Sequence, residues 1–135
     1  IIKLEKKIQL LHRKIANIRK NYLHQVTTEI VKIKPFRVVI EDLNVKGMMK
    51  NRHLSKAIAN QGFYEFRRML EYKCKFKGIE LILADRFFPS SKMCSKCGVI
   101  DKKLKLSDRV YKCNCGLSID RDFNASINLS NYKLA

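Results

Sequence analysis

The sequence predicts an α/β fold in which a long helix precedes one parallel β-α-β unit, with a small cysteine-bearing insert toward the C-terminus. Three observations predict it: heptad-spaced apolar residues near the N-terminus, two β-branched apolar runs flanking a helical pattern, and four cysteines in two close pairs. A chain of 135 residues is long enough for one domain, or for a small core with a mini-domain attached.

The segment 3–34 has the pattern of an amphipathic helix. Its apolar residues recur at spacings of four and three, typical of a coiled-coil stripe: Leu4, Ile8, Leu11, Ile15, Ile18 and Tyr22. Residues 1–34 also carry nine Lys or Arg against two Glu, which indicates either a solvated face or a phosphate contact. Pro35 ends the helix, because the residue before a proline disfavours helical dihedral angles.

Two strands and a second helix follow. Residues 36–43 form a short β-branched run and residues 79–84 form another strand-like run, and the first is typical of a strand buried on both faces of a parallel sheet. Between them, a basic loop leads into a helix over 54–77, which Ser55 caps and Gly78 ends, with Gly62 as a mild interior defect. Strand, helix and strand predict a right-handed crossover between parallel strands. The apolar face of this helix comprises Ala59, Phe63, Phe66, Leu70 and Cys74.

The segment 87–117 is predicted to be a separate insert whose core is too small to hold without a metal ion. A C-x₂-C pair and a C-x-C pair stand fifteen residues apart in it: Cys94, Cys97, Cys113 and Cys115. Four thiolates suit tetrahedral Zn²⁺ with no open position, which indicates a structural site. Two disulfides or four free thiols are the alternatives, and both are disfavoured in a chain without secretory features.

Carboxylates at element ends suggest a second metal site. Glu41 falls at the carboxyl end of the first strand, where sites of open α/β sheets gather. Asp120 and Asp122 come at the start of a short helix predicted over 122–131. Such acids can hold Mg²⁺ or Mn²⁺, although acids at strand ends and helix caps are more often structural. Asp85, at the end of the second strand, is a further candidate of the same kind.

The charge of the chain favours a polyanionic partner. Its formal net charge is +17, which points to nucleic acid first and to an anionic membrane second. The basic clusters that we expect along phosphates contain Lys46, Lys50 and Arg52, then Lys102, Lys103, Lys105 and Arg109, although solubilising loops are an equal alternative. No signal peptide or membrane-spanning run is recognisable, so a cytoplasmic, nucleoid-associated protein is expected.

Four motifs, in order, resemble the C-terminal half of the TnpB (OrfB) family. They are VVIEDLNVKGM, DRFFPSSKMCSKCG, LSDRVYKCNCG and IDRDFNASINL. Proteins of this family are encoded by bacterial and archaeal insertion sequences and are related to the compact type V CRISPR effector nucleases. The likeness runs from about residue 3 to about residue 130.

The resemblance implies a partial RNase H-like (RuvC) fold with an inserted zinc ribbon. It divides the chain into 1–86 and 118–135, which belong to the RuvC part, and the ribbon at 87–117. Family members are guided by an RNA and cut DNA with three acids. The resemblance carries over Glu41 and Asp122 as catalytic ligands of Mg²⁺ or Mn²⁺, with Asp120 less certain and Asp85 without a metal role. Arg121 and Asn124, in the same motif, are expected to support the site, and Arg121 is also expected to contact nucleic acid.

The chain departs from the family pattern in one respect that matters for activity. The first catalytic Asp of the family lies in a GIDLG-like motif, and no such motif occurs here. We therefore expect a fragment or truncated form that is inactive alone, with a non-catalytic zinc-ribbon DNA- or RNA-binding protein, or a transposase accessory remnant, as the alternative. The first strand would lack a neighbour, so a homodimer through the N-terminal helix or this exposed edge is also expected. A helical interaction protein built on the first stripe is a weaker third reading.

Overall fold

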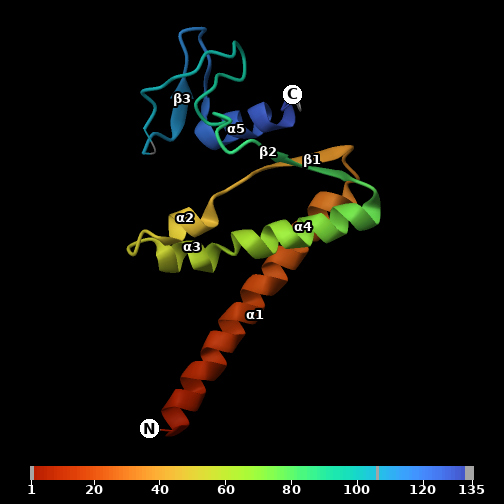
Figure 1. The fold of residues 1–135 in the computed structure, drawn as a ribbon, viewed down its shortest axis with the longest axis vertical. Helices are drawn as coiled ribbons and strands as arrows, with labels where there is room; N and C mark the ends of the chain where they lie inside the picture. The colour runs from red at the N-terminus through yellow and green to blue at the C-terminus, as the bar shows by residue number, and fades with distance from the viewer. Residues whose placement is uncertain (1, 106, 133–135) are drawn as a thin grey trace. The chain divides into compact units, whose positions relative to one another are not determined.

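The computed structural model describes residues 2–105 and 107–132, in two compact units. The first unit takes in Ile1–Arg37 and Asn44–Leu81, and the second takes in Val38–Leu43 and Ile82–Ala135. The elements in chain order are α1 (Ile2–Lys32), β1 (Arg37–Glu41), α2 (Val45–Met49), α3 (Ser55–Gln61), α4 (Phe63–Lys77), β2 (Glu80–Ala84), β3 (Val110–Lys112), β4 (Ser118–Asp120) and α5 (Arg121–Ser130) (Figure 1). The prediction of a mixed α/β fold is confirmed.

The first unit is built on the packing of α4 against the C-terminal part of α1, while the N-terminal part of α1 extends away from it (Figure 1). Its buried residues include Thr27 and Val31 of α1 and Met69, Leu70 and Cys74 of α4. The predicted apolar stripe of α1 takes no part in this core, because every member from Leu4 to Tyr22 is at least 45% exposed.

A lysine of α4 fastens the two helices. Lys73 Nζ donates to the His24 carbonyl, to Thr27 Oγ1 and to Thr28 Oγ1, each at 2.7 Å. Desolvation by burial lowers the pKa of this ammonium group. Hydrogen bonds from a charged donor are stronger than neutral ones. These polar contacts therefore hold α4 against α1 beyond Tyr22, the last residue of the apolar stripe.

The helix predicted over 54–77 is wrong, because the structure has two helices there. Gly62 lies between α3 and α4 in the left-handed region, with φ of +69°, where only glycine is unstrained. Ala59 is consequently exposed, although Leu70 and Cys74 are buried as predicted. Ser55 is not the cap: it is the first residue of α3, and its hydroxyl bonds back to the Arg52 carbonyl.

The stretch predicted as a basic loop also contains a helix. Asn44 caps α2, because its Oδ1 accepts a hydrogen bond from the Gly47 amide at 3.0 Å. This single turn carries Lys46 and ends next to Lys50, both of which are exposed.

The second unit combines the parallel pair of β1 and β2 with a small antiparallel pair and α5. The second pair joins β3 to β4, with Tyr111 opposite Ile119. The prediction that the first strand is buried on both faces is wrong: β1 is only half-buried, because in this structure its sheet has a single partner strand. Residues 37–41 form β1, so Phe36 and Leu43 lie outside it. Among the described residues, no helix is long and apolar enough to cross a bilayer.

Candidate functional site

Four cysteine sulfurs converge in the second unit. The Sγ atoms of Cys94, Cys97, Cys113 and Cys115 all lie within 4.8 Å of one another. Cys94 Sγ lies 3.6 Å from Cys115 Sγ, and Cys97 Sγ lies 3.5 Å from Cys113 Sγ. Sulfurs bound to one tetrahedral zinc ion by bonds of about 2.3 Å stand about 3.8 Å apart. None of the four cysteines forms a disulfide, so the alternative of two disulfides is not seen, and four sulfurs at these distances fit a zinc ion.

Two short turns bring the pairs together. The Gly98 amide donates to the Cys94 carbonyl at 2.8 Å, and the Gly116 amide donates to the Cys113 carbonyl at 3.0 Å. The second turn must be tight, because one residue fewer separates its cysteines, and Gly116 there has a φ of +86°. The turn that carries the C-x-C pair therefore depends on Gly116, whose backbone conformation other residues rarely adopt.

The electrostatics of the cluster favour a cation. Burial raises the pKa of Cys94, but the amides of Cys97 and Lys96 and the neighbouring thiols donate to its sulfur and lower the pKa to about 6. At Cys113 the Cys115 amide lowers the pKa, while burial and the neighbouring thiolates outweigh it and raise the pKa to about 12. Four thiolates at this spacing repel one another, and a bound divalent cation removes that repulsion.

Glu41 is held at the carboxyl end of β1, as the sequence predicted. It is exposed, and it lines a cavity of about 310 Å³ together with residues 84–92, which follow the end of β2. Its Oε1 accepts a hydrogen bond from the Ser90 hydroxyl at 2.5 Å. Beside it, Arg86 forms an ion pair with Asp42 at 2.9 Å. The Glu41 carboxylate is therefore exposed to solvent, at the edge of a cavity next to the ends of β1 and β2.

The two aspartates at the start of α5 differ in their surroundings. Asp120 is the N-cap, and its Oδ1 accepts hydrogen bonds from the amides of Asp122 and Phe123, each at 2.9 Å. Asp122 stands in the first turn with its side chain 74% exposed, 3.5 Å from the guanidinium of Arg121. The Arg121 side chain is only 14% exposed and also donates to the Lys105 carbonyl. Asp122 is thus the more available carboxylate of the pair.

Two asparagines of α5 are buried structural residues, of which the sequence singled out Asn124 as a support of the site and gave no role to Asn128. Asn124 is fully buried, donates to the Met93 carbonyl at 2.7 Å and accepts from the Ser95 amide at 3.0 Å. Asn128 donates to the carbonyls of Ser90 and Met93, both at 2.7 Å. Asparagine is a weak helix former. Its occurrence at two positions one turn apart in α5 is a sequence signal for side-chain contacts with the rest of the fold.

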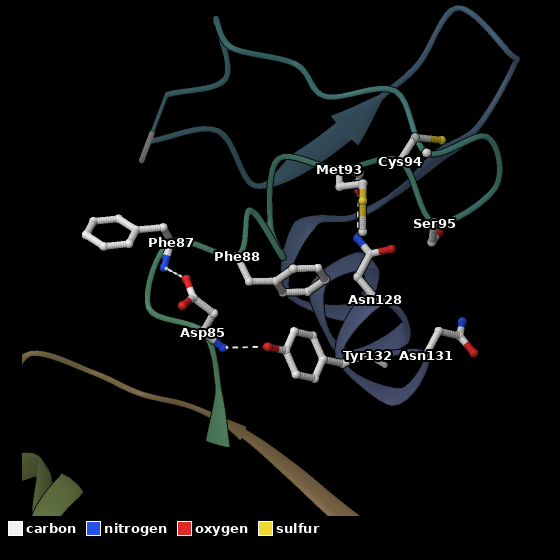
Figure 2. A pocket seen from close by; sticks show the side chains of 10 residues that line it. Asp85, Phe87, Phe88, Met93, Cys94, Ser95, Asn128, Asn131 and Tyr132 are labelled. Atoms are coloured by element: carbon white, nitrogen blue, oxygen red, sulfur yellow. Dashed lines mark hydrogen bonds between the residues drawn. The ribbon is translucent and has the colours of Figure 1, made fainter. Parts of the chain in front are cut away.

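An open hollow of about 620 Å³ lies beside these asparagines (Figure 2). Phe88 packs edge-on against Tyr132, and the Asp85 amide donates to the Tyr132 hydroxyl at 3.0 Å. The Asp85 carboxylate accepts from the Phe87 amide at 2.7 Å, so it stabilises the turn after β2.

The carboxylates do not form a three-ligand cluster in this structure. Within residues 2–105 and 107–132, the group of three or more ligand side chains whose atoms converge consists of the four cysteines. Glu41, Asp120 and Asp122 belong to the same compact unit without forming such a group. The basic residues predicted at the interface are exposed, with the exception of Arg121: Lys46, Lys50, Arg52, Lys102, Lys103, Lys105 and Arg109.

Fold and site together define a class of protein in which an α/β framework carries a four-cysteine module suited to zinc. Two family models match the chain: "Probable transposase" (OrfB_IS605) over residues 2–52, and "Cas12f1-like, TNB domain" over residues 63–129. These two matches do not overlap and together take in most of the chain.

Named relatives agree with these models. The chain is 43% identical over 127 residues to a "Putative RNA-guided DNA endonuclease" of Streptomyces pristinaespiralis, covering 94% of the chain and 31% of the relative. It is 36% identical to the "Putative RNA-guided DNA endonuclease InsQ" of Escherichia coli, covering 94% and 35%. The solved "Cryo-EM structure of the Cas12f1-sgRNA-target DNA complex" is similar with a TM-score of 0.75 and 29% identity, over 98% of this chain and 39% of that one.

The chain belongs to the OrfB/TnpB family, and its named relatives include proteins called RNA-guided DNA endonuclease and Cas12f1. It spans about a third of the length of the relatives reported above.

Proposed function

We propose that this chain is the C-terminal part of a TnpB-type RNA-guided DNA endonuclease, carrying two of the three acids of a RuvC-like metal site and a structural zinc ribbon. The observation that carries the proposal is the position of Glu41, at the end of a parallel strand and in the wall of a cavity. Asp122 supplies the second carboxylate from the first turn of α5, where it is exposed. The family assignment supports the same pair of residues.

Each residue has a distinct part in this proposal. Glu41 and Asp122 hold Mg²⁺ or Mn²⁺, hard cations that prefer carboxylate oxygens. When bound, such ions activate water and stabilise the attacking and leaving oxygens of a phosphodiester. Asp120 acts mainly as the cap that orients the first turn of α5, and Arg121 supports Asp122 rather than contacting a phosphate, because its side chain is mostly buried. The four cysteines hold Zn²⁺ as a structural ion.

The exposed basic residues contact nucleic acid. Lys46, Lys50 and Arg52 belong to the first unit, and four others belong to the second unit, within the segment that we propose as the ribbon: Lys102, Lys103, Lys105 and Arg109. The net charge of +17 supports a phosphate-dominated, sequence-independent component of binding. DNA and a guide RNA are the partners that we propose, and a cytoplasmic, nucleoid-associated location follows from them.

A non-catalytic DNA- or RNA-binding function is the second candidate. It is favoured by the finding that the cysteines are the converging ligand group in the part of the chain that the structure describes, whereas the acids form no such group. Two of three catalytic acids leave metal ions under-coordinated, and residues of one catalytic unit act non-additively, so we expect this chain alone to cut feebly or not at all.

Cleavage and binding measured on the 135-residue chain test the proposal. We expect DNA binding that weakens steeply with salt, together with little cleavage in Mg²⁺ or Mn²⁺. Glu41→Ala and Asp122→Ala should abolish whatever metal-dependent cleavage is present. Strong cleavage that survives Glu41→Ala would show that the assigned site is wrong, and a flat salt response would contradict both candidates.

A further inference from the structure

The carboxylate of Glu41 is anchored by a buried hydroxyl. Ser90 is 4% exposed, and its Oγ donates to Glu41 Oε1. Glu41 is itself exposed and is the last residue of β1. An exposed glutamate ordinarily samples several rotamers, so a fixed donor selects those in which Oε1 meets the hydroxyl. The same contact leaves Oε2 for another ligand.

Ser90 is itself fixed from α5. Its carbonyl accepts a hydrogen bond from Asn128 Nδ2 at 2.7 Å, and its amide donates to the Phe88 carbonyl at 2.8 Å. Asn128 is 5% exposed and donates also to the Met93 carbonyl, which Asn124 reaches from one turn earlier. Figure 2 shows Asn128 of α5 turned toward Met93, beside the loop that follows β2. Two buried asparagine amides therefore hold the backbone at Ser90 and at Met93, next to the hydroxyl that meets Glu41.

We propose that Ser90 is a positioning residue for Glu41. The Ser90 hydroxyl donates a hydrogen bond to Glu41 Oε1, and this contact orients Oε2 toward a divalent cation. This inference rests on the proposed metal-binding role of Glu41. A carboxylate that ligates a metal ion is oriented by hydrogen bonds to its other oxygen, and losing such a partner typically weakens metal binding by about 10- to 100-fold. The contact has this form: a buried donor, a strand-end carboxylate and a cavity beside it.

A purely structural role for Ser90 predicts a different mutational pattern. If the serine only fills space in the loop after β2, shape will matter and the hydroxyl will not. Thr and Val have almost the same shape and differ in the hydroxyl, so Ser90→Thr and Ser90→Val form a matched pair. Both add a methyl branch to a buried site, and Val also replaces the hydroxyl with a second methyl, so the packing cost of the added branch is shared between them.

The test is Mn²⁺ binding to the zinc-loaded 135-residue chain, measured by the loss of the free-Mn²⁺ electron paramagnetic resonance signal. We expect Ser90→Ala and Ser90→Val to weaken binding about tenfold or more, and Ser90→Thr to stay within about threefold of the unmodified chain. Ser126→Ala is the control: its hydroxyl also donates one hydrogen bond, to the Phe123 carbonyl at 2.7 Å, and it should leave Mn²⁺ affinity unchanged.

The outcomes separate this inference from the proposed function. If Glu41→Gln abolishes Mn²⁺ binding while Ser90→Ala binds as the unmodified chain does, the positioning role is wrong and the metal role of Glu41 stands. Equal losses in Ser90→Thr and Ser90→Val would also overturn the positioning role, because the hydroxyl would not be the cause. If Glu41→Gln binds Mn²⁺ unchanged, the proposed site is wrong and the role of Ser90 falls with it.

Discussion

Replacing Asn124 by alanine should destabilise the second unit by more than the substitution of an exposed asparagine would. The side chain is fully buried, and it both donates to the Met93 carbonyl and accepts from the Ser95 amide. Met93 keeps a second donor in Asn128, so the principal loss is a partner for the Ser95 amide. An unsatisfied buried donor costs about 1–3 kcal/mol. The cavity left by three heavy atoms adds about 1 kcal/mol, giving about 2–4 kcal/mol in total.

The measurement is urea unfolding of the zinc-loaded chain, followed by the nuclear magnetic resonance signals of the α5 amides. These signals report on the second unit alone, so unfolding of the first unit does not enter the value. Asn131→Ala is the control, because that residue is exposed at the end of the same helix and should change the free energy of unfolding by less than about 0.5 kcal/mol. A loss for Asn124→Ala as small as that of the control would refute the reasoning.

Three further predictions concern the first unit, the cysteine cluster and the ribbon. Lys73→Met removes three hydrogen bonds from α4 to α1 and should destabilise the first unit by about 1–3 kcal/mol in thermal unfolding, whereas the exposed Lys75→Met should have little effect. Removing zinc with a chelator should unfold the four-cysteine segment, because its core is too small to hold without the ion, and unchanged nuclear magnetic resonance signals of the Cys97 and Cys113 amides would contradict a structural zinc site. Replacing three exposed ribbon lysines by alanine should reduce the slope of log affinity for duplex DNA against log salt by about 2–3, and an unchanged slope would exclude them from the interface: Lys102, Lys103 and Lys105.

Patterns with a fixed period or spacing predicted the structure well. The C-x₂-C and C-x-C pairs predicted the convergence of four sulfurs, because thiolate ligands need few residues and short turns to meet. The spacing of apolar residues predicted α1 over nearly its whole length. It did not predict which face packs, because the buried contacts with α4 come from Thr27 and Val31 rather than from the stripe.

Features that depend on a single residue's conformation or on distant partners were not predictable in this way. Gly62 is compatible with a helix at a modest cost, and only its positive φ in the folded chain separates α3 from α4. The pairing of Ser90 with Glu41 joins residues 49 positions apart, and no local pattern encodes it. The helix α5 begins at Arg121, one residue earlier than predicted. Asp120 is therefore its N-cap, because the cap is the residue that precedes the first helical residue.

The central claim is that Glu41 and Asp122 supply two acids of a nuclease site that the rest of a TnpB-type protein completes. The most direct test replaces the matching C-terminal part of the Streptomyces pristinaespiralis relative with this chain and measures RNA-guided plasmid cleavage in Mg²⁺. The account predicts that the hybrid cuts, that Glu41→Gln and Asp122→Asn each abolish cutting without loss of DNA binding, and that Asp120→Asn retains measurable cutting. Cleavage that persists in the Glu41→Gln hybrid would contradict it.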